Sequence, residues 1–225
     1  MRNVLVCSLI CFALSTVYVS ADVGNYKVKT VDKAAPKELK ADVQKLLDAK
    51  AIQFTDKKGD LIAELWFRKD IPVTIAPKDK KAVFSTVPMT SIIGAVKFAK
   101  DWREYRGRKL KAGVYSLRFA MQPQDGNHMG TALHSEFLIL LAAKFEPSAK
   151  PLNPMELVDR SKASIKSGHP AILQLFPYTN DKAAPNLTES AKDHVVLNLR
   201  QPVVMNGSAV GPLGIGVTLV GEASE

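Results

Sequence analysis

Apolar and polar residues alternate along several short runs of the chain, as they do in β-strands that bury one face. From Leu61 to Phe67 every second residue is apolar, which is the two-residue period of a strand. The polar segment Asp56–Asp60 contains a glycine and separates this run from Ile52–Thr55, so the two runs predict a β-hairpin. Six further runs predict strands: Ile92–Phe98, Val114–Met121, Phe137–Ala142, Ala171–Phe176, Val195–Leu199 and Ile215–Val220.

Two other segments have the spacing of short amphipathic helices. Lys37–Ala49 carries apolar residues at i, i+4, i+7 and i+8, which lie on one face of a helix. Pro36 precedes this segment and suits the beginning of a helix. Met155–Lys166 predicts the second helix. The residues that we expect to face inward are Leu39, Val43, Leu46 and Leu47 in the first helix, and Met155, Leu157 and Val158 in the second.

The remaining segments are polar, charged or rich in proline and glycine, and they predict connections. They are Pro72–Pro88, Lys100–Lys111, Pro147–Pro154, Asn180–Asp193 and Gln201–Gly214. Residues 22–36 are lysine-rich and predict a flexible N-terminal arm, or alternatively a first edge strand. About eight short strands without regular strand–helix alternation favour a mainly β fold. We expect one antiparallel β-sandwich domain over residues 37–225, either prealbumin- or immunoglobulin-like or jelly-roll-like, with two short helices.

The first 21 residues have the pattern of a secretory signal peptide. Arg2 is followed by the apolar stretch Val4–Ala13 and by the small-residue sequence Val19-Ser20-Ala21. The apolar stretch is shorter than a membrane-spanning helix, and we expect no span after cleavage. Both cysteines, Cys7 and Cys11, lie in this segment. Cleavage would leave a chain that has neither disulfides nor thiolate metal ligands, exported to the periplasm or the exterior.

Charge is distributed unevenly between the two halves of the chain. Residues 22–111 contain 21 Lys and Arg against 12 Asp and Glu, whereas residues 112–225 contain 9 against 10. The segment Lys97–Lys111 mixes basic and aromatic residues, which suits contact with a glycan, an envelope polysaccharide or another anionic surface. A solvated connection whose Trp102 covers one end of the sandwich is the alternative. Export makes nucleic acid an unexpected partner. The candidate contact residues are Lys97, Lys100, Trp102, Arg103, Tyr105, Arg106 and Arg108.

A second candidate site lies on the connection between the strands Val114–Met121 and Phe137–Ala142. Asp125, His128 and His134 lie on this connection, and His169 would join them if its strand begins at the same rim. Histidine and carboxylate side chains bind divalent transition metals such as zinc, copper, nickel or iron. The spacing matches no known metal motif, however, and Asp125-Gly126-Asn127 is also ordinary turn chemistry. A metal site, a metal-free ligand site and a structural turn are therefore all open.

Motifs for common catalytic mechanisms are missing from the sequence. Gly207–Gly211 has its serine one place too early for a nucleophile elbow. Gly211–Gly216 runs into an apolar strand rather than a helix, so it does not fit a dinucleotide-binding turn. Paired carboxylates drawn from Glu64, Asp125 and Glu136 stay open, but no pattern marks them as a pair. The sequence thus favours a non-enzymatic protein over a metal-dependent hydrolase.

Several short motifs between residues 40 and 180 resemble those of an uncharacterised family of secreted bacterial proteins, of the kind seen in planctomycete-like and acidobacterial-like genomes. The motifs are Glu64-x-Trp66-x-Arg68, Arg106-Gly107, Gly113-Val114-Tyr115-Ser116-Leu117-Arg118, Gln122–Gly130 (QPQDGNHMG), the strand entered at Phe137, and Gly168-His169-Pro170-Ala171. The resemblance implies an exported β-sandwich and no established activity. We therefore expect a non-enzymatic binding or accessory module of the cell envelope.

Overall fold

The computed structural model describes residues 20–76, 84–122, 134–190 and 194–221. Its architecture is mainly β and sandwich-like, which confirms the predicted fold class. The strands are β1 (Ser20–Val23), β2 (Tyr26–Asp32), β3 (Lys50–Asp56), β4 (Leu61–Phe67), β5 (Ile71–Pro72), β6 (Ile92–Phe98), β7 (Trp102–Arg103), β8 (Lys109–Leu110), β9 (Gly113–Met121), β10 (Glu136–Ala142), β11 (Ala171–Pro177), β12 (Asn186–Ser190), β13 (His194–Met205) and β14 (Ser208–Val220). The helices are α1 (Ala41–Leu46) and α2 (Pro154–Ile165), with 3-10 turns η1 (Phe84–Thr86) and η2 (Ala143–Phe145).

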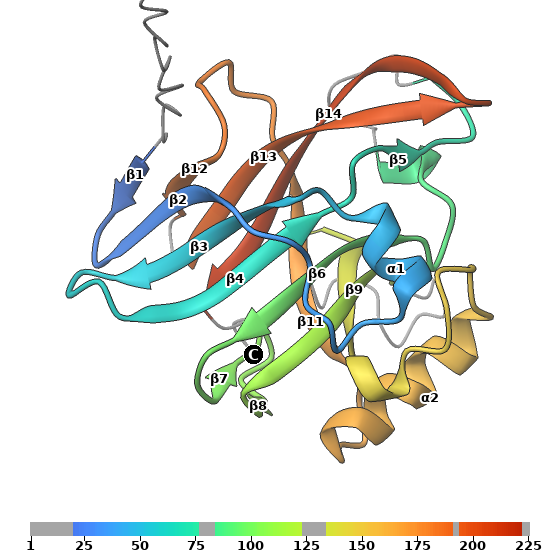
Figure 1. The fold of residues 1–225 in the computed structure, drawn as a ribbon, viewed down its shortest axis with the longest axis horizontal. Coiled ribbons are helices and arrows are strands. Elements are labelled where there is room, and N and C mark those ends of the chain that lie inside the picture. Colours follow the sequence, from blue (N-terminus) through green and yellow to red (C-terminus); the bar gives the residue numbers. More distant parts are fainter. Residues whose placement is uncertain (1–19, 77–83, 123–133, 191–193, 222–225) are drawn as a thin grey trace, which may run out of the picture.

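Most of the strands belong to one long antiparallel sheet that folds over on itself (Figure 1). Its order is β1-β2-β3-β4-β6-β9-β10-β11-β14-β13-β12, with β5 joined in parallel to β13. Strands β1 and β12 stand at opposite ends of this order and nevertheless contact each other. The sheet therefore encloses a core between its two halves, while β7 and β8 form a separate small hairpin.

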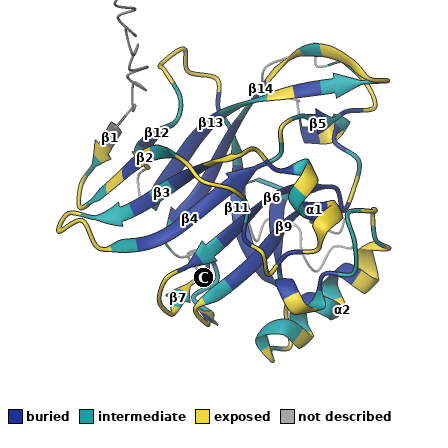
Figure 2. Cartoon of the chain, in the orientation of Figure 1, coloured by how far each residue is buried: buried dark blue, intermediate teal, exposed yellow. Residues whose placement is uncertain are grey.

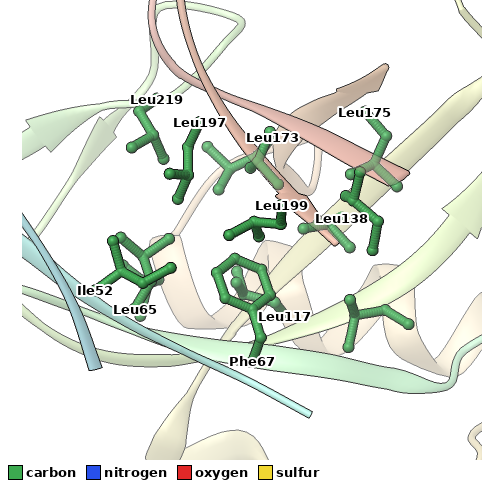
Figure 3. Close-up of a cluster of buried hydrophobic side chains, with 14 of the residues drawn as sticks. Ile52, Leu65, Phe67, Leu117, Leu138, Leu173, Leu175, Leu197, Leu199 and Leu219 are labelled. Atoms are coloured by element: carbon green, nitrogen blue, oxygen red, sulfur yellow. The ribbon is translucent and has the colours of Figure 1, made fainter. Parts of the chain in front are cut away.

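The core lies on the inner face of the folded sheet, where the apolar side chains of both halves meet (Figure 3). Strand β9 supplies Tyr115, Leu117 and Phe119, which alternate in sequence with residues on the outer face. This alternation is the two-residue period of a strand. Figure 3 shows leucines of β10, β11, β13 and β14 opposite Ile52, Leu65 and Phe67. The predicted strands therefore bury the faces that their patterns favour.

The central strands are buried on their outer face as well, as Figure 2 shows for β4, β6 and β9. Leu39, Val43 and Leu47, in and around α1, pack on Trp66 of β4 and Ile92 of β6. This helix is shorter than predicted, but these three leucine and valine side chains are buried as expected. Helix α2 covers β10 and β11 farther along the sheet. Two layers of apolar contacts thus enclose the middle of the sheet.

Helix α2 has clear start and stop signals and a polar attachment to the sheet. The Asn153 side chain accepts a hydrogen bond from the Met155 backbone N–H, and Pro154 occupies the first turn. The buried Ser161 Oγ donates to Leu140 O at 2.6 Å and accepts from the Ala171 N–H at 3.1 Å. One hydroxyl therefore joins α2 to two strands.

The largest buried polar group lies on the outer face of β9. Arg118 and Glu146 are both fully buried, and two hydrogen bonds of 2.9 and 2.6 Å join the guanidinium to the carboxylate. The other three guanidinium hydrogens point at the backbone carbonyls of Thr90, Ser148 and Lys150. All five donors of an arginine therefore have partners. The group attaches the connection between β10 and α2 to the centre of the sheet.

The expectation of a flexible N-terminal arm over residues 22–36 is wrong. Tyr26–Asp32 is strand β2, which pairs with β3 along its whole length. Directly after it, Lys33 Nζ lies 2.6 Å from the buried Glu64 carboxylate, and its carbonyl accepts from Trp66 Nε1 at 2.8 Å. The lysine-rich composition reflects a strand near the end of the sheet, between β1 and β3, whose alternate side chains face solvent.

Further predicted connections contain strands that the sequence did not indicate, among them 100–111, which contains β7 and β8. Strands β13 and β14 extend through the predicted loop 201–214 and meet at Asn206-Gly207, whose φ angles are 51° and 81°. An Asn-Gly pair with positive φ suits a two-residue hairpin turn. Strand β12 lies in the predicted loop 180–193. Met155 was expected to face inward but is 68% exposed, whereas Leu157 is buried.

Among the described residues, no helix is both long and apolar enough to cross a bilayer. The predicted signal segment lies almost wholly outside these residues, so export stays a prediction.

We predict that Glu146→Gln lowers the free energy of unfolding by about 3–5 kcal/mol, because the buried Arg118 charge loses its counterion. Urea titration monitored by tryptophan fluorescence measures this change. The matched control is Glu156→Gln, which breaks the exposed Glu156–Arg160 pair on α2 and should change stability by less than about 1 kcal/mol. Equal effects of the two substitutions would contradict a central role for the buried pair.

Candidate ligand-binding site

A pocket of about 340 Å³ opens between α2 and the outer face of the sheet. Its apolar wall comes from Phe137 and Ile139 of β10, Ile172 of β11 and Val158 of α2. The three strand residues alternate with inward-facing neighbours, so their side chains point away from the main core. An apolar wall of this kind provides the bulk of binding energy in most small-molecule pockets.

Three basic residues stand around this apolar wall. Arg106 comes from the β7–β8 hairpin, Lys162 from α2, and His169 from the segment that leads into β11. Lys162 Nζ is 3.9 Å from Asp159 on the same helix. No carboxylate is found in the lining that the described residues provide. The pocket therefore combines an apolar interior with a positive rim.

Arg106 has the most unusual environment of the three. Its side chain is half-buried, and within the described ranges no hydrogen bond or ion pair holds its guanidinium. Burial, and then the charge of Arg108, lower the pKa of the Arg106 guanidinium from its usual value, whereas Glu104 raises it. An arginine stays protonated in a protein despite such shifts. A charge of this kind favours an anion beside it.

The position of Arg106 is set by the buried carboxylate of Glu104. One Glu104 oxygen accepts from the backbone N–H groups of Arg106 and Arg108, each at 3.0 Å, and the other accepts from the Ile172 N–H at 3.0 Å. Between them, Tyr105 is buried against the outer face of the sheet. The turn at the tip of the β7–β8 hairpin is thereby attached to β11. Arg106 is held at the pocket by backbone contacts rather than by its own side chain.

Burial raises the pKa of the Glu104 carboxyl, and this effect exceeds the opposing hydrogen bonds from Ile172 and Arg108 and the charge of Arg108. Ionising the buried Glu104 carboxyl therefore costs free energy, although its hydrogen bonds to backbone N–H groups organise the hairpin. Such a cost is typical of a carboxylate that is removed from water.

The predicted metal ligands are only partly within the described residues. Asp125 and His128 lie outside them. His134 is described: its carbonyl accepts from the Gln174 amide at 3.0 Å, and its ring meets the edge of Phe176 at 5.0 Å. His169 is exposed at the pocket rim, and Met121 and Gln122, at the end of β9, line the same pocket. Searching the described part of the chain finds no group of three His, Cys, Asp or Glu side chains able to hold a metal ion.

Ala171 pairs with Leu140, and Leu140 with Leu117, so β11 begins level with the middle of β9 and not at the end where Met121 lies. His134 makes its contacts over β11. The predicted metal site stays a prediction, since two of its four residues are not described.

The basic-aromatic segment does not form the flat pair of exposed rings that would stack on a ligand. Tyr105 is 7% exposed and meets the His194 ring edge-on, so its predicted role in ligand contact is wrong. Trp102 is half-buried, donates from Nε1 to Leu219 O at 3.0 Å, and lies edge-on to Phe54. It covers one end of the core, which was the alternative interpretation.

The basic residues of this segment point to different surroundings. Lys97 pairs with Glu38 at 3.2 Å, and Lys100 is exposed. Arg103 donates to Gly107 O at 2.7 Å, whereas Arg108 donates to Pro170 O at 3.3 Å. Arg106 alone of these five lines the pocket beside α2. The segment is therefore divided between two faces of the molecule.

Sequence reasoning missed the apolar wall of the pocket. Phe137, Ile139 and Ile172 belong to runs that are apolar at nearly every position, which signals burial on both faces. The available signal was the absence of alternation in β10 and β11. This signal did not indicate which helix covers the second face of the strands, or that a pocket remains between the helix and the strands.

Comparison of the chain with protein-family models, with curated proteins and with solved structures gave no match.

We predict that Glu104 makes stability depend on pH in the opposite sense from a salt-bridged carboxylate. Its folded-state pKa is raised, so the native state binds the proton more tightly, and the native state gains stability as pH falls through that pKa. The unfolding free energy of wild type minus that of Glu104→Gln should increase from pH 7 to pH 4. Urea titrations of both proteins at several pH values measure it. A difference that grows with rising pH would show that the hydrogen bonds outweigh burial.

Proposed function

We propose that this protein is an exported, non-enzymatic binding or accessory module, and that it binds a small amphipathic anion in the pocket beside α2. The observation that carries this proposal is the half-buried Arg106 guanidinium, which lies next to an apolar wall and has no side-chain partner among the described residues. The ligand would be a compact apolar group with one carboxylate, sulfonate or phosphate. The first 21 residues support export through their signal-peptide pattern.

The two parts of the pocket have different roles in this proposal. Phe137, Ile139 and Ile172 would bind the apolar group by removing its surface from water, at about 25 cal/mol per Å². Arg106 would bind the anion with charge-assisted hydrogen bonds, which suit a planar carboxylate. Lys162 at the rim adds positive charge, and His169 adds a hydrogen-bonding ring. Affinity would come mainly from the wall, and selection of anions over neutral molecules mainly from Arg106.

A binding role agrees with the chemistry of the described pocket lining better than catalysis does. A hydrolase needs an acid and a base, or a metal, at one reacting bond. The described lining offers cations and an amide, Gln122, but no carboxylate next to His169. The same residues suit the retention of an anion without a reaction.

We predict that the wild-type protein binds octanoate more tightly than 1-octanol, and that Arg106→Gln abolishes this preference. Loss of one charge-assisted contact of about 1.5–3 kcal/mol should weaken octanoate binding by roughly tenfold or more. Binding of 1-octanol should stay nearly unchanged, because the apolar wall is intact. Isothermal titration calorimetry gives both affinities.

The matched control is Arg103→Gln, which removes the same charge from the same hairpin outside the pocket. It should leave octanoate binding within about twofold, since exposed charges are screened by salt. Equal losses of octanoate affinity in the two variants would show that the effect of Arg106→Gln comes from net charge alone. Failure of wild type to bind either compound would reject the pocket as the site.

A further inference from the structure

A second concave region lies on a different part of the surface, around the base of the β7–β8 hairpin. One hollow of about 550 Å³ is lined by residues 101–103, by Lys109 and by Val220-Gly221. A neighbouring hollow of about 590 Å³ runs between the beginning of β9, the end of β10 and the end of α2. Lys109 lines both, so the two hollows adjoin, and we call them together the lysine groove.

Basic residues from four separate segments converge on the lysine groove. They are Arg103, Lys109, Lys111, Lys144 and Lys166. Two carboxylates, Asp101 and Glu38, also line it. Glu38 already pairs with Lys97 at 3.2 Å, so the groove keeps an excess of positive charge. Lys144 and Lys166 contribute to this excess from the second half of the chain, whose overall charge is nearly balanced.

Asp101 organises the lysines at the centre of the groove. Its carboxylate lies 2.9 Å from Lys111 Nζ and 3.5 Å from Lys109 Nζ, and accepts from the Ala112 N–H at 3.0 Å. The Lys111 hydrogen bond, followed by that of the Ala112 backbone, lowers the pKa of the Asp101 carboxyl to about 2. Asp101 is therefore ionised at neutral pH and holds two lysine side chains side by side. Both lysines remain largely exposed.

The lysine groove also has apolar and aromatic surfaces that suit the faces of sugar rings. Trp102 lines the first hollow and is fixed there by its bond to Leu219 O. Val114, Ala142 and Ile165 lie along the second hollow. A half-buried tryptophan beside charged side chains provides a stacking face together with hydrogen-bond donors. A flat lipid surface would contact neither the recessed tryptophan ring nor the apolar side chains inside the hollows.

Lys166 occupies an unusual backbone position at the end of the groove. It ends α2 with φ 53° and ψ 48°, a left-handed conformation that glycine or asparagine usually adopts. A lysine there has a steric cost that a glycine would avoid. This position therefore carries a basic side chain that lines the groove, although glycine would adopt the left-handed backbone conformation with less strain.

We propose that the lysine groove binds an acidic polysaccharide, with a sugar ring on Trp102 and carboxylates on the lysines. Its concave form suits a chain that lies along it, whereas a bilayer is flat and would meet only the rims. The large exposed apolar side chains of the described residues are Ile75, Met89 and Met155, and none of them lines the groove. Insertion into lipid therefore has no apolar anchor at this surface. This inference is independent of the pocket beside α2.

The test measures binding of polygalacturonate to the full chain, with neutral dextran as the reference polymer. Wild type should bind polygalacturonate with an affinity that falls steeply with salt, as expected for contacts between lysines and a polyanion. The double substitution Lys144→Gln/Lys166→Gln should weaken binding roughly tenfold or more. The charge-matched control Lys57→Gln/Lys58→Gln, in the exposed β3–β4 turn, should weaken it by less than about twofold.

Two further variants give results that net charge alone would not produce. Asp101→Asn makes the groove more positive but removes the carboxylate that holds Lys109 and Lys111 side by side, so binding should weaken, whereas net charge alone would tighten it. Of the two tryptophans, Trp66 is buried at 1% exposure, so polymer binding should change the emission of Trp102. That change should disappear in Trp102→Leu.

Equal weakening by the groove and control pairs would overturn the proposal, as would unchanged binding in the groove pair. Groove-dependent binding to phosphatidylglycerol vesicles without binding to polygalacturonate would replace it with a membrane role. Octanoate affinity should be the same in all these variants, so failure here is distinguishable from failure of the pocket beside α2.

Discussion

The buried ion pair between Arg118 and Glu146 is the interaction on which the rest of the structure depends. It lies on the outer face of β9, whose inner face contributes Tyr115, Leu117 and Phe119 to the main core. A guanidinium with no exposure is tolerated only because five hydrogen bonds replace its water. Three of these bonds go to backbone carbonyls of the 148–150 segment and Thr90. The pair therefore determines where the chain runs after β10, and hence where α2 begins.

The location of α2 in turn creates the pocket. The helix is joined to β10 and β11 by Ser161, and the pocket lies between its first turns and Phe137, Ile139 and Ile172, which are 4–6% exposed. The β7–β8 hairpin closes another side, because Glu104 binds the backbone of Ile172. Arg106 thus reaches an apolar surface that belongs to a different part of the sequence. The buried Glu104 positions backbone directly, and the buried Glu146 does so through Arg118, whose guanidinium binds three carbonyls.

Prediction from the sequence was most successful where one local pattern decides the outcome. The strands β4, β6, β9, β10 and β11 were predicted within a few residues, because alternation or continuous apolar character reports burial directly. It failed where a strand is polar and paired, as in β2 and β12, and where proline and glycine interrupt a long hairpin, as in β13–β14. In those places backbone pairing with a neighbour outweighs composition. The pocket itself was not predicted: His169 was expected at a metal site and Arg106 at a glycan or polyanion surface, and the apolar wall beside them had no place in either expectation.

The sequence by itself therefore determined the class of fold, the segments that enter the core and the positive charge of residues 22–111. These follow from periodicity and composition, which are properties of neighbouring residues. Only the tertiary structure decided which face α2 covers, that Tyr105 is buried while Arg106 reaches a pocket, and that basic residues from four segments share one groove. The physical reason is that such contacts join residues far apart in the chain. Their formation depends on the pairing order of the sheet and on buried polar groups, such as Arg118, whose partners no local pattern identifies.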